Sequence, residues 1–265
     1  MLFGGTNSPF RPLEDEIKNL AATGVDYLEI CLDPPQASPE ILRPKIPMIK
    51  RVLEGEGLQL LVAHLPTFVW LADIYPGIRE ASAAEVVKTL EISAELGIKK
   101  AVLHPGYLTG LMTFLKDYSQ KASEESLSRI LEKAGEFGLT ICLENLFPRA
   151  GQMYLPQEFT EVLEKFPDLM MTLDLAHANI KAPRERMKEM IQAGGARIRH
   201  VHLADNNGQE DDHLPVGAGR ADLAGGLAAL KAMGYDETIT LEVFSPDREY
   251  LAMSLSKVKA MWDKA

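Results

Sequence analysis

The stretch Ile198-Arg199-His200-Val201-His202-Leu203-Ala204-Asp205 has the apolar alternation of a short strand and then runs into a polar loop. From His200 to His213 it holds three histidines and three aspartates in fourteen residues, and the loop carries no positive charge. One such residue alone is commonly an ordinary hydrogen-bonding group. Imidazoles and carboxylates gathered at one strand end are the ligands that divalent metals prefer. A similar unit, an apolar run that ends in a histidine or an acidic residue, recurs along the chain and decides the fold.

Short β-type runs alternate with longer amphipathic runs along the whole chain, as is typical of βαβ units around a parallel sheet. The predicted strands are 2–6, 27–32, 58–65, 100–104, 140–144, 170–174, 198–203 and 238–243. The predicted helices are 12–22, 38–54, 80–96, 123–137, 156–166, 183–193, 222–233 and 248–262. Eight strands that are each followed by a helix predict a single (β/α)8 TIM barrel, with residues 1–265 as one domain.

The composition disfavours several classes of function. Hydrophobic residues make up 46% and charged residues 25% of the chain, as in ordinary globular proteins. A net charge of −10 disfavours a general affinity for nucleic acid or anionic membranes. Cys31 and Cys142 lie in separate apolar runs, which predicts two buried thiols in a reducing compartment. No targeting segment or membrane-spanning apolar run is apparent, so we expect a cytoplasmic protein.

The functional residues of a TIM barrel stand at the carboxyl ends of its strands. Six consecutive predicted strands end at residue types that bind metals, and five of the six histidines lie at or just beyond these ends. The strand-end residues are His64, His104, Glu144, Asp174 with His177, His202 with Asp205, and Glu242. Such groups converging on one barrel mouth would repel one another or stay unsatisfied without a cation, which predicts a metal site. His200 lies one layer deeper than His202, and we assign it to the core.

These residues resemble the motifs of the xylose isomerase-like TIM barrels, which include sugar-phosphate isomerases and epimerases and the AP endonuclease family 2 enzymes (endonuclease IV). The motifs are HxP at His64, HPG at His104, LEN at Glu144, DxxH at Asp174, HxxD at His202, DxH at Asp211 and a final Glu242. The resemblance implies that one divalent metal, Mn, Co, Mg or Zn, is held by Glu144, Asp174, His202 and Glu242. The endonuclease IV pattern implies up to three zinc ions, with His64, His104, His177, Asp211 and His213 as further ligands.

The resemblance implies a metal-dependent isomerase or epimerase of a small sugar or sugar phosphate. The reaction would pass through an enediolate, with Glu144 and Glu242 taking and returning the proton. His177 would bind a substrate hydroxyl. Many ketose epimerases carry an arginine shortly after the histidine of strand seven, whereas this chain has Asn206 and Asn207 in that region. The exact reaction therefore stays open.

Two other functions stay open. An endonuclease IV-like zinc phosphodiesterase matches the same nine ligand positions, but it needs phosphate-binding groups, and the predicted loops 33–38 and 204–219 contain no Lys or Arg. Nucleic acid is therefore a disfavoured partner. The third alternative is a barrel that binds a sugar or a metal without catalysis.

Four more residues are candidates for substrate contacts. Trp70 could stack on a sugar face, although an aromatic covering the rim fits equally well. Glu29 could reach substrate from inside the barrel or be a buried, hydrogen-bonded carboxylate. Arg149 could clamp an anionic group, although a surface position is the simpler assignment, and Arg220 could touch a phosphate. The glycine-containing segment around Arg220 predicts a turn followed by a helix cap at Asp222 rather than a phosphate loop.

Overall fold

The computed structural model describes residues 1–265 as a closed barrel of eight parallel strands. Each strand pairs with the next one in the chain, and β8 pairs with β1 to close the ring. The strands are β1 (Leu2–Thr6), β2 (Tyr27–Cys31), β3 (Gln59–His64), β4 (Lys100–Leu103), β5 (Thr140–Glu144), β6 (Met170–Asp174), β7 (Ile198–Leu203) and β8 (Thr238–Leu241). The prediction of a single (β/α)8 barrel is confirmed.

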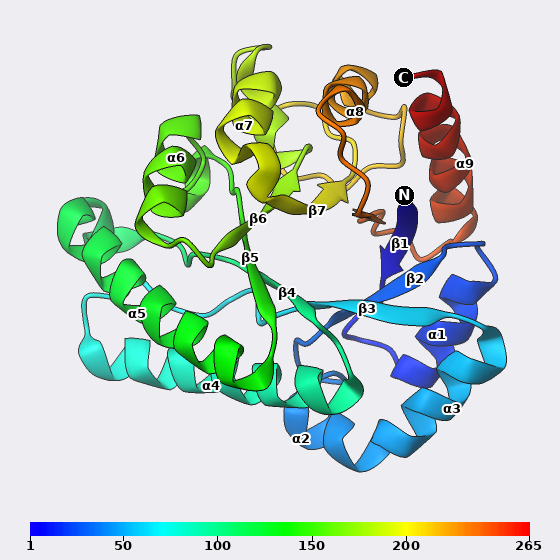
Figure 1. The fold of residues 1–265 in the computed structure, drawn as a ribbon, viewed down its shortest axis with the longest axis horizontal. Helices are drawn as coiled ribbons and strands as arrows, with labels where there is room; N and C mark the ends of the chain where they lie inside the picture. The colour runs from blue at the N-terminus through cyan, green and yellow to red at the C-terminus, as the bar shows by residue number, and fades with distance from the viewer.

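Helices surround the strands on the outside of the barrel (Figure 1). They are α1 (Leu13–Ala21), α2 (Pro39–Leu42), α3 (Ile46–Glu56), α4 (Pro76–Leu96), α5 (Lys116–Phe137), α6 (Pro156–Lys165), α7 (Arg186–Gly194), α8 (Leu223–Ala232) and α9 (Glu249–Lys264). Short 3-10 turns are η1 (Arg43–Lys45), η2 (Gly110–Thr113), η3 (Pro148–Ala150), η4 (His177–Asn179) and η5 (Gly195–Arg197). Gly97 and Gly138 end α4 and α5 in the left-handed conformation, at φ of 89° and 68°, as their positions after the amphipathic runs predict.

The apolar core lies between the strands and the helices, where 57 buried hydrophobic residues form one cluster. Inside the barrel a second, much smaller cluster consists of Tyr27, Val62 and Val102. Successive side chains of a strand point to opposite faces of the sheet, so the residues two positions after Val62 and Val102 also face inward. These residues are His64 and His104. The same alternation places the other strand-end polar residues on the inner face, at the top of the barrel.

The predicted helix at 38–54 is wrong in detail, because the chain forms α2, η1 and α3 there. Pro44 and Pro47 have no backbone N–H to donate, and a proline ring clashes with the carbonyl four residues earlier, so one continuous helix cannot form. Helices α4 and α5 begin earlier than predicted, at Pro76 and Lys116. A proline suits the first helical position, because the N–H that it lacks would be unpaired there. Helix α7 begins at Arg186 rather than 183.

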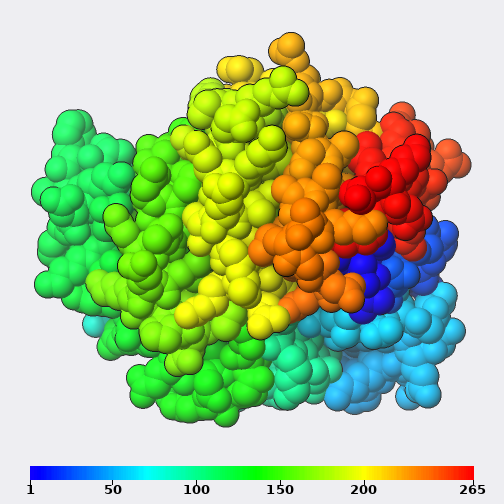
Figure 2. Space-filling view, turned by 45° about the horizontal axis from the view of Figure 1, so that its top comes forward, coloured from blue at the N-terminus to red at the C-terminus, as the bar shows by residue number.

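The first and last strands of the chain meet where the barrel closes. In Figure 2 the blue N-terminal residues lie beside the orange and red C-terminal segments, and the amino group of Met1 pairs with Asp236 at 2.5 Å. None of the helices combines the length and the apolarity needed to cross a lipid bilayer. Both cysteines are free, but only Cys142 is fully buried. The prediction of two buried thiols is therefore wrong for Cys31, which ends β2 and donates its thiol to Asp33 at 3.4 Å.

Candidate metal centre at the barrel mouth

Nine polar side chains from β3 to β8 and the loops after them converge at the carboxyl end of the barrel. All nine predicted ligand positions are linked by contacts between imidazoles and carboxylates. Seven of the nine are buried, and the other two, on the loop after β7, are partly buried. The buried seven are His64, His104, Glu144, Asp174, His177, His202 and Glu242, and the partly buried two are Asp211 and His213.

Glu144, the last residue of β5, is the centre of this cluster. Its Oε2 lies 3.1 Å from His104 Nε2 and 3.6 Å from His64 Nε2. Its Oε1 lies 3.3 Å from Nδ1 of both His177 and His202. Burial raises the pKa of Glu144, but the positive charges of His202 and His104 outweigh it and hold the pKa well below its usual value. An ionised carboxylate with four imidazoles around it is suited to bridge cations.

His202, on β7, has a ring nitrogen that the protein leaves unpaired. The residue is fully buried, and its Nδ1 has no hydrogen-bond partner. This nitrogen faces Glu144 Oε1 at 3.3 Å and Glu242 Oε1 at 3.6 Å. A buried polar atom without a partner costs about 1–3 kcal/mol, which a metal ligand bond would offset. The residues therefore fit a divalent ion, and the mixed nitrogen and oxygen donors suit Zn, Mn or Co.

Three other histidines of the mouth place Nδ1 on a backbone carbonyl. The partners are Leu65 O at 2.9 Å for His64, Asn145 O at 2.9 Å for His177 and Glu242 O at 3.2 Å for His213. In each ring Nε2 then faces a carboxylate: Glu144 for His64, and Asp211 for His177 and His213. Metal-binding histidines almost always donate their other ring N–H in this way, because the bond fixes the tautomer and the ring orientation.

Asp211 joins two of these histidines on the loop after β7. Its Oδ2 lies 3.2 Å from His177 Nε2 and 3.0 Å from His213 Nε2. Burial raises the pKa of Asp211, but the bonds from the two histidines outweigh it and hold the pKa well below its usual value. His213 takes a left-handed backbone, at φ 47°, and stacks on Phe244 with ring centroids 4.1 Å apart. A non-glycine residue in that conformation is uncommon and is found where a side chain must be aimed.

Protons on the histidines balance the negative charge of the mouth. Burial lowers the pKa of His64, but its bond with Glu144 and the charge of Glu144 outweigh this effect and raise the pKa to about 9. Burial raises the pKa of Asp174 to about 7, although the charge of His177 opposes it. A divalent cation binds unprotonated ligands and would take the place of these protons.

Ligand atoms of several triads lie within 4.8 Å of one another, close enough to hold one ion. The triads at the mouth are His64 with His104 and Glu144, His64 with His202 and Glu242, and Glu144 with Asp174 and His177. The first triad coincides with part of the predicted three-zinc pattern. The predicted principal set of Glu144, Asp174, His202 and Glu242 is divided between the other two triads, with Glu144 and His202 in contact across them.

The predicted substrate contacts lie in different surroundings. Glu29 is fully buried beneath the mouth and accepts hydrogen bonds from two histidines, so it is a buried, hydrogen-bonded carboxylate. Trp70 is 42% exposed, and the aromatic rings that pair on its side of the mouth are Phe68 and Tyr107, 6.1 Å apart. Arg149 is 81% exposed and pairs with Glu210 at 3.8 Å. Arg220 is also exposed. Substrate contacts by Trp70, Arg149 and Arg220 stay predictions.

Two residues that the sequence reasoning did not single out support the site. Asn145 donates from Nδ2 to Asp174 O at 2.9 Å and accepts from Asp174 N at 2.8 Å, which fixes the end of β6 against β5. The hydroxyl of Tyr107 lies 3.5 Å from His104 Nδ1. Asn145 is the last residue of the motif Leu143-Glu144-Asn145, and Tyr107 directly follows His104-Pro105-Gly106, so their positions beside these strand ends were the available signal.

Asp205 organises the loop that carries the end of the site rather than the site itself. Its buried carboxylate accepts the backbone N–H groups of Gly217, Gly219 and Ala221 at 2.9 to 3.1 Å. Asp222 then caps α8 by accepting from Gly225 N at 3.0 Å. The predicted turn and helix cap around Arg220 are therefore confirmed.

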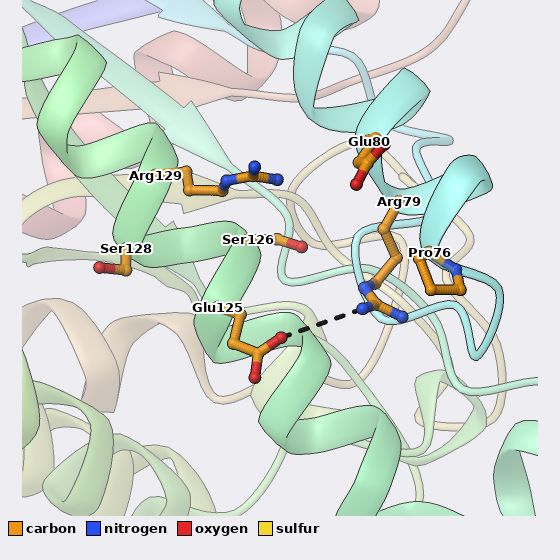
Figure 3. A pocket seen from close by; sticks show the side chains of 7 residues that line it. All are labelled: Pro76, Arg79, Glu80, Glu125, Ser126, Ser128 and Arg129. Atoms are coloured by element: carbon orange, nitrogen blue, oxygen red, sulfur yellow. Dashed lines mark ion pairs between the residues drawn. The ribbon is translucent and has the colours of Figure 1, made fainter.

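A separate cleft of about 460 Å³ lies between α4 and α5 (Figure 3). Its lining residues are Pro76, Arg79, Glu80, Glu125, Ser126, Ser128 and Arg129. Arg79 points toward Glu125 across the cleft, at 3.9 Å, and also donates to Asp73 O at 2.7 Å. Two arginines are balanced there by two glutamates, and none of the nine mouth residues takes part. Two buried atoms without a hydrogen-bond partner, His202 Nδ1 and Asp211 Oδ1, belong to the mouth, and none belongs to this cleft.

Comparison with known proteins agrees with this arrangement. The family described as xylose isomerase-like TIM barrel matches residues 17–261. The chain belongs to the xylose isomerase-like TIM barrel family. The resemblance inferred from the strand-end motifs is confirmed.

Relatives of the chain in the xylose isomerase-like family cover nearly all of its length. It is 29% identical over 252 residues to the uncharacterized protein MJ1311 of Methanocaldococcus jannaschii, across 91% of this chain and 83% of that protein. It is 22% identical over 268 residues to fructoselysine 3-epimerase of Escherichia coli O157:H7, across 94% of each. The crystal structure of a D-tagatose 3-epimerase-like protein matches it with a TM-score of 0.86 at 26% identity, over 100% of this chain and 99% of that one.

Proposed function

We propose that the protein is a divalent-metal-dependent isomerase or epimerase of a small sugar or sugar phosphate. The observation that carries the proposal is the pair Glu144 and Glu242, whose carboxylates lie 3.3 and 3.6 Å from the unpaired Nδ1 of His202. Isomerisation and epimerisation both remove and return a proton on carbon, which requires positioned acid and base groups. The names of two relatives, fructoselysine 3-epimerase and D-tagatose 3-epimerase-like protein, support this class of reaction.

Glu144, Asp174, His202 and Glu242 would hold the ion. When bound, the ion supplies Lewis acidity that makes the C–H beside a substrate carbonyl more acidic. Glu242 is the freer carboxylate, because its oxygens lie 3.6 Å and 3.8 Å from the nearest histidine nitrogens, on His202 and His213. We therefore assign Glu242 to take the proton. Glu144, more firmly held among its histidines, would return it, and His177 would orient a substrate hydroxyl.

The experiment is proton exchange with solvent. Protein purified without chelators is incubated in D2O with a panel of ketoses and their phosphates, in the presence of Mn, Co, Mg or Zn. We expect deuterium to appear by NMR on a carbon next to the carbonyl of at least one sugar, and to stop appearing when a chelator removes the metal. No exchange with any sugar by metal-loaded protein, together with measurable sugar binding, would instead support the barrel that only binds.

The second candidate is an endonuclease IV-like zinc phosphodiesterase. The observation that favours it is the contact of Asp211 with both His177 and His213, at 3.2 and 3.0 Å, since these three residues complete the three-zinc pattern. The basic residues near this loop do not favour it, because Arg149 and Lys181 both pair with Glu210. Elemental analysis separates the two candidates. Three zincs per chain and cleavage of an abasic-site oligonucleotide would overturn the isomerase proposal.

A further inference from the structure

We infer that Glu29 is a positioning residue, which sets the tautomer of His202 through a hydrogen-bonded chain in the barrel core. The inference rests on the proposed metal centre, because it concerns how one of its ligands is held. Glu29 lies on β2 and His202 on β7, so the bond between them crosses the interior of the barrel. Both residues are fully buried.

The hydrogen-bonded chain consists of four contacts between side chains. From the floor of the barrel, Lys100 Nζ lies 3.1 Å from Thr238 Oγ1, and Thr238 Oγ1 lies 2.8 Å from His200 Nδ1. His200 Nε2 lies 2.8 Å from one oxygen of Glu29. The other oxygen of Glu29 lies 3.0 Å from His202 Nε2. The chain therefore runs from the partly exposed Lys100 to the fully buried His202 without a gap.

The chemistry of the two ends fixes the hydrogen positions. An ammonium group only donates, so Thr238 Oγ1 accepts from Lys100 and its own hydrogen is free to go to His200 Nδ1. An ionised carboxylate only accepts, so the Nε2 atoms of His200 and His202 both donate to Glu29. Every donor then points toward Glu29, and each group in the chain is satisfied.

The hydrogen bond to Glu29 determines which nitrogen of His202 is available to the proposed metal ion. Because His202 keeps its hydrogen on Nε2, its Nδ1 carries the lone pair, and Nδ1 is the atom that faces Glu144 and Glu242. A carboxylate behind a histidine ligand fixes the tautomer and raises the basicity of the ligand nitrogen. Glu29 is itself held at two points, since the rings of His200 and His202 approach it at 88° to each other.

The backbone also directs Glu29 inward. Tyr27 faces the interior, and Glu29 follows it by two positions on β2, so its side chain points inward as well. The register shift between β2 and β3 passes over Leu61 of β3 and leaves this alternation of β2 unchanged. Alternation therefore places the Glu29 carboxylate one layer below the mouth, where it contacts two histidines of β7.

The test replaces Glu29 with glutamine. Glu29→Gln keeps the shape but has one acceptor oxygen and one donating NH2 group, so one of the two histidine N–H groups loses its acceptor. We expect the metal affinity to fall about 10- to 100-fold, which is the usual effect of removing the hydrogen-bond partner of a ligand histidine. The affinity is measured by competition with a chromogenic chelator. We also expect the ring ¹⁵N shifts of His202, in metal-free protein at a pH that leaves the ring neutral, to report loss of the pure Nε2–H tautomer.

Tyr27→Phe is the matched control. Tyr27 lies on the same strand, and the substitution removes a buried hydrogen bond of 2.7 Å to Thr240, which is not part of the hydrogen-bonded chain from Lys100 to His202. If Glu29 had only a structural role, both variants would be less stable than the wild type, but both would keep the metal affinity and the His202 tautomer of the wild type. Folded Glu29→Gln with wild-type affinity and an unchanged His202 tautomer would overturn the inference.

Two further outcomes keep the inference separate from the proposed function. If Glu29→Gln does not fold, the wild type decides: at a pH that leaves the metal-free His202 ring neutral, a hydrogen on Nδ1 rather than Nε2 overturns the inference. If the protein binds metal but exchanges no sugar proton, the proposed function fails, while the affinity and tautomer data still decide the role of Glu29.

Discussion

Beneath the barrel mouth Glu29, His200 and Thr238 make hydrogen bonds of 2.8 to 3.0 Å, whereas at the mouth the carboxylates of Glu144 and Glu242 lie 3.1 to 3.8 Å from their histidines. Both regions are built from the same residue types, and they are only one layer apart on the same strands. In the lower region every side-chain nitrogen and oxygen atom has a hydrogen-bond partner. In the upper region His202 Nδ1 and Asp211 Oδ1 have none.

The difference separates a structural cluster from the candidate ligand site. A buried polar group without a partner costs about 1–3 kcal/mol, so a folded protein keeps such groups where a ligand completes them. The lower cluster is complete as it stands and needs no ion. In the upper cluster the carboxylate oxygens outnumber the hydrogens that neutral histidines can donate. Either several histidines are protonated, or a divalent cation takes the place of these protons.

The largest expected effect is the loss of proton exchange when Glu242, at the barrel mouth, is replaced. Glu242→Gln keeps the size of the side chain but removes the base, and we expect kcat for the exchanged sugar to fall roughly 10²- to 10⁴-fold, the usual contribution of acid–base catalysis. The measurement is the rate of deuterium uptake from D2O. The control is Glu249→Gln, an exposed glutamate in the first turn of α9, which should retain the wild-type rate. Equal rates for both variants would remove Glu242 from the mechanism.

The residues at the mouth could be predicted from the sequence because a strand alternates with a period of two residues. Once eight strands were recognised, His64, His104, Glu144, Asp174 and His202 had to share the inner face at one end of the barrel. Helix boundaries were less predictable, because each depends on one local choice, such as the two prolines that break the segment after Ser38.

What the sequence could not give is the pairing across the barrel. Glu29 and His200 are far apart in the chain, and the bond of 2.8 Å between them depends on the register of strands on opposite sides of the ring. The same holds for which nitrogen of each histidine faces the mouth. That choice depends on backbone carbonyls such as Leu65 O, whose direction no side-chain pattern encodes.

The second prediction concerns stability with and without metal. At a free ion concentration about 1,000 times Kd, binding to the folded state should add about 4 kcal/mol to the free energy of unfolding. For a chain of this size we expect Tm to rise by roughly 10 °C relative to chelator-treated protein. His202→Ala should lose most of that rise, whereas Tyr27→Phe should keep it. A calorimetric scan that shows the full rise in His202→Ala would mean that the ion binds elsewhere.

The third prediction is a pH dependence that distinguishes the two clusters. In metal-free protein the pKa of His64 is raised to about 9, so its contribution to stability is present below the unfolded pKa of about 6.5 and is lost as the pH rises through 9. We expect the free energy of unfolding in urea to fall on the order of 2 kcal/mol over this range. Saturating metal should abolish the fall, because the ion binds the unprotonated ring.

His200 should take no part in this titration. Burial lowers its pKa to about 4, although Glu29 opposes the effect, so the ring stays neutral throughout the range. His64→Gln should therefore reduce the loss of stability between pH 6.5 and 9. Stability that rises with pH in the chelated wild type would contradict the assignment of protons to the mouth.

The smallest effect is expected at the floor of the barrel, where Glu237 pairs with Lys100 at 2.8 Å and with Arg199 at 2.5 Å. Burial raises the pKa of Glu237, but the bonds from Lys100 and Arg199 outweigh it and lower the pKa. The stabilisation is thus present above the unfolded pKa and is lost as the pH falls. Because Glu237 is partly exposed, we expect Glu237→Gln to cost below about 1 kcal/mol at neutral pH.

The metal affinity of Glu237→Gln tests whether Glu237 belongs to the hydrogen-bonded chain that holds His202. Lys100 still has Thr238 and the carbonyl of Arg199 as partners when Glu237 is removed, so the links up to His202 should survive. We expect Glu237→Gln to bind metal as the wild type does, in contrast to Glu29→Gln. A loss of affinity as large as that of Glu29→Gln would mean that the ion pairs at the floor, and not only the buried carboxylate, hold the ligand histidine in place.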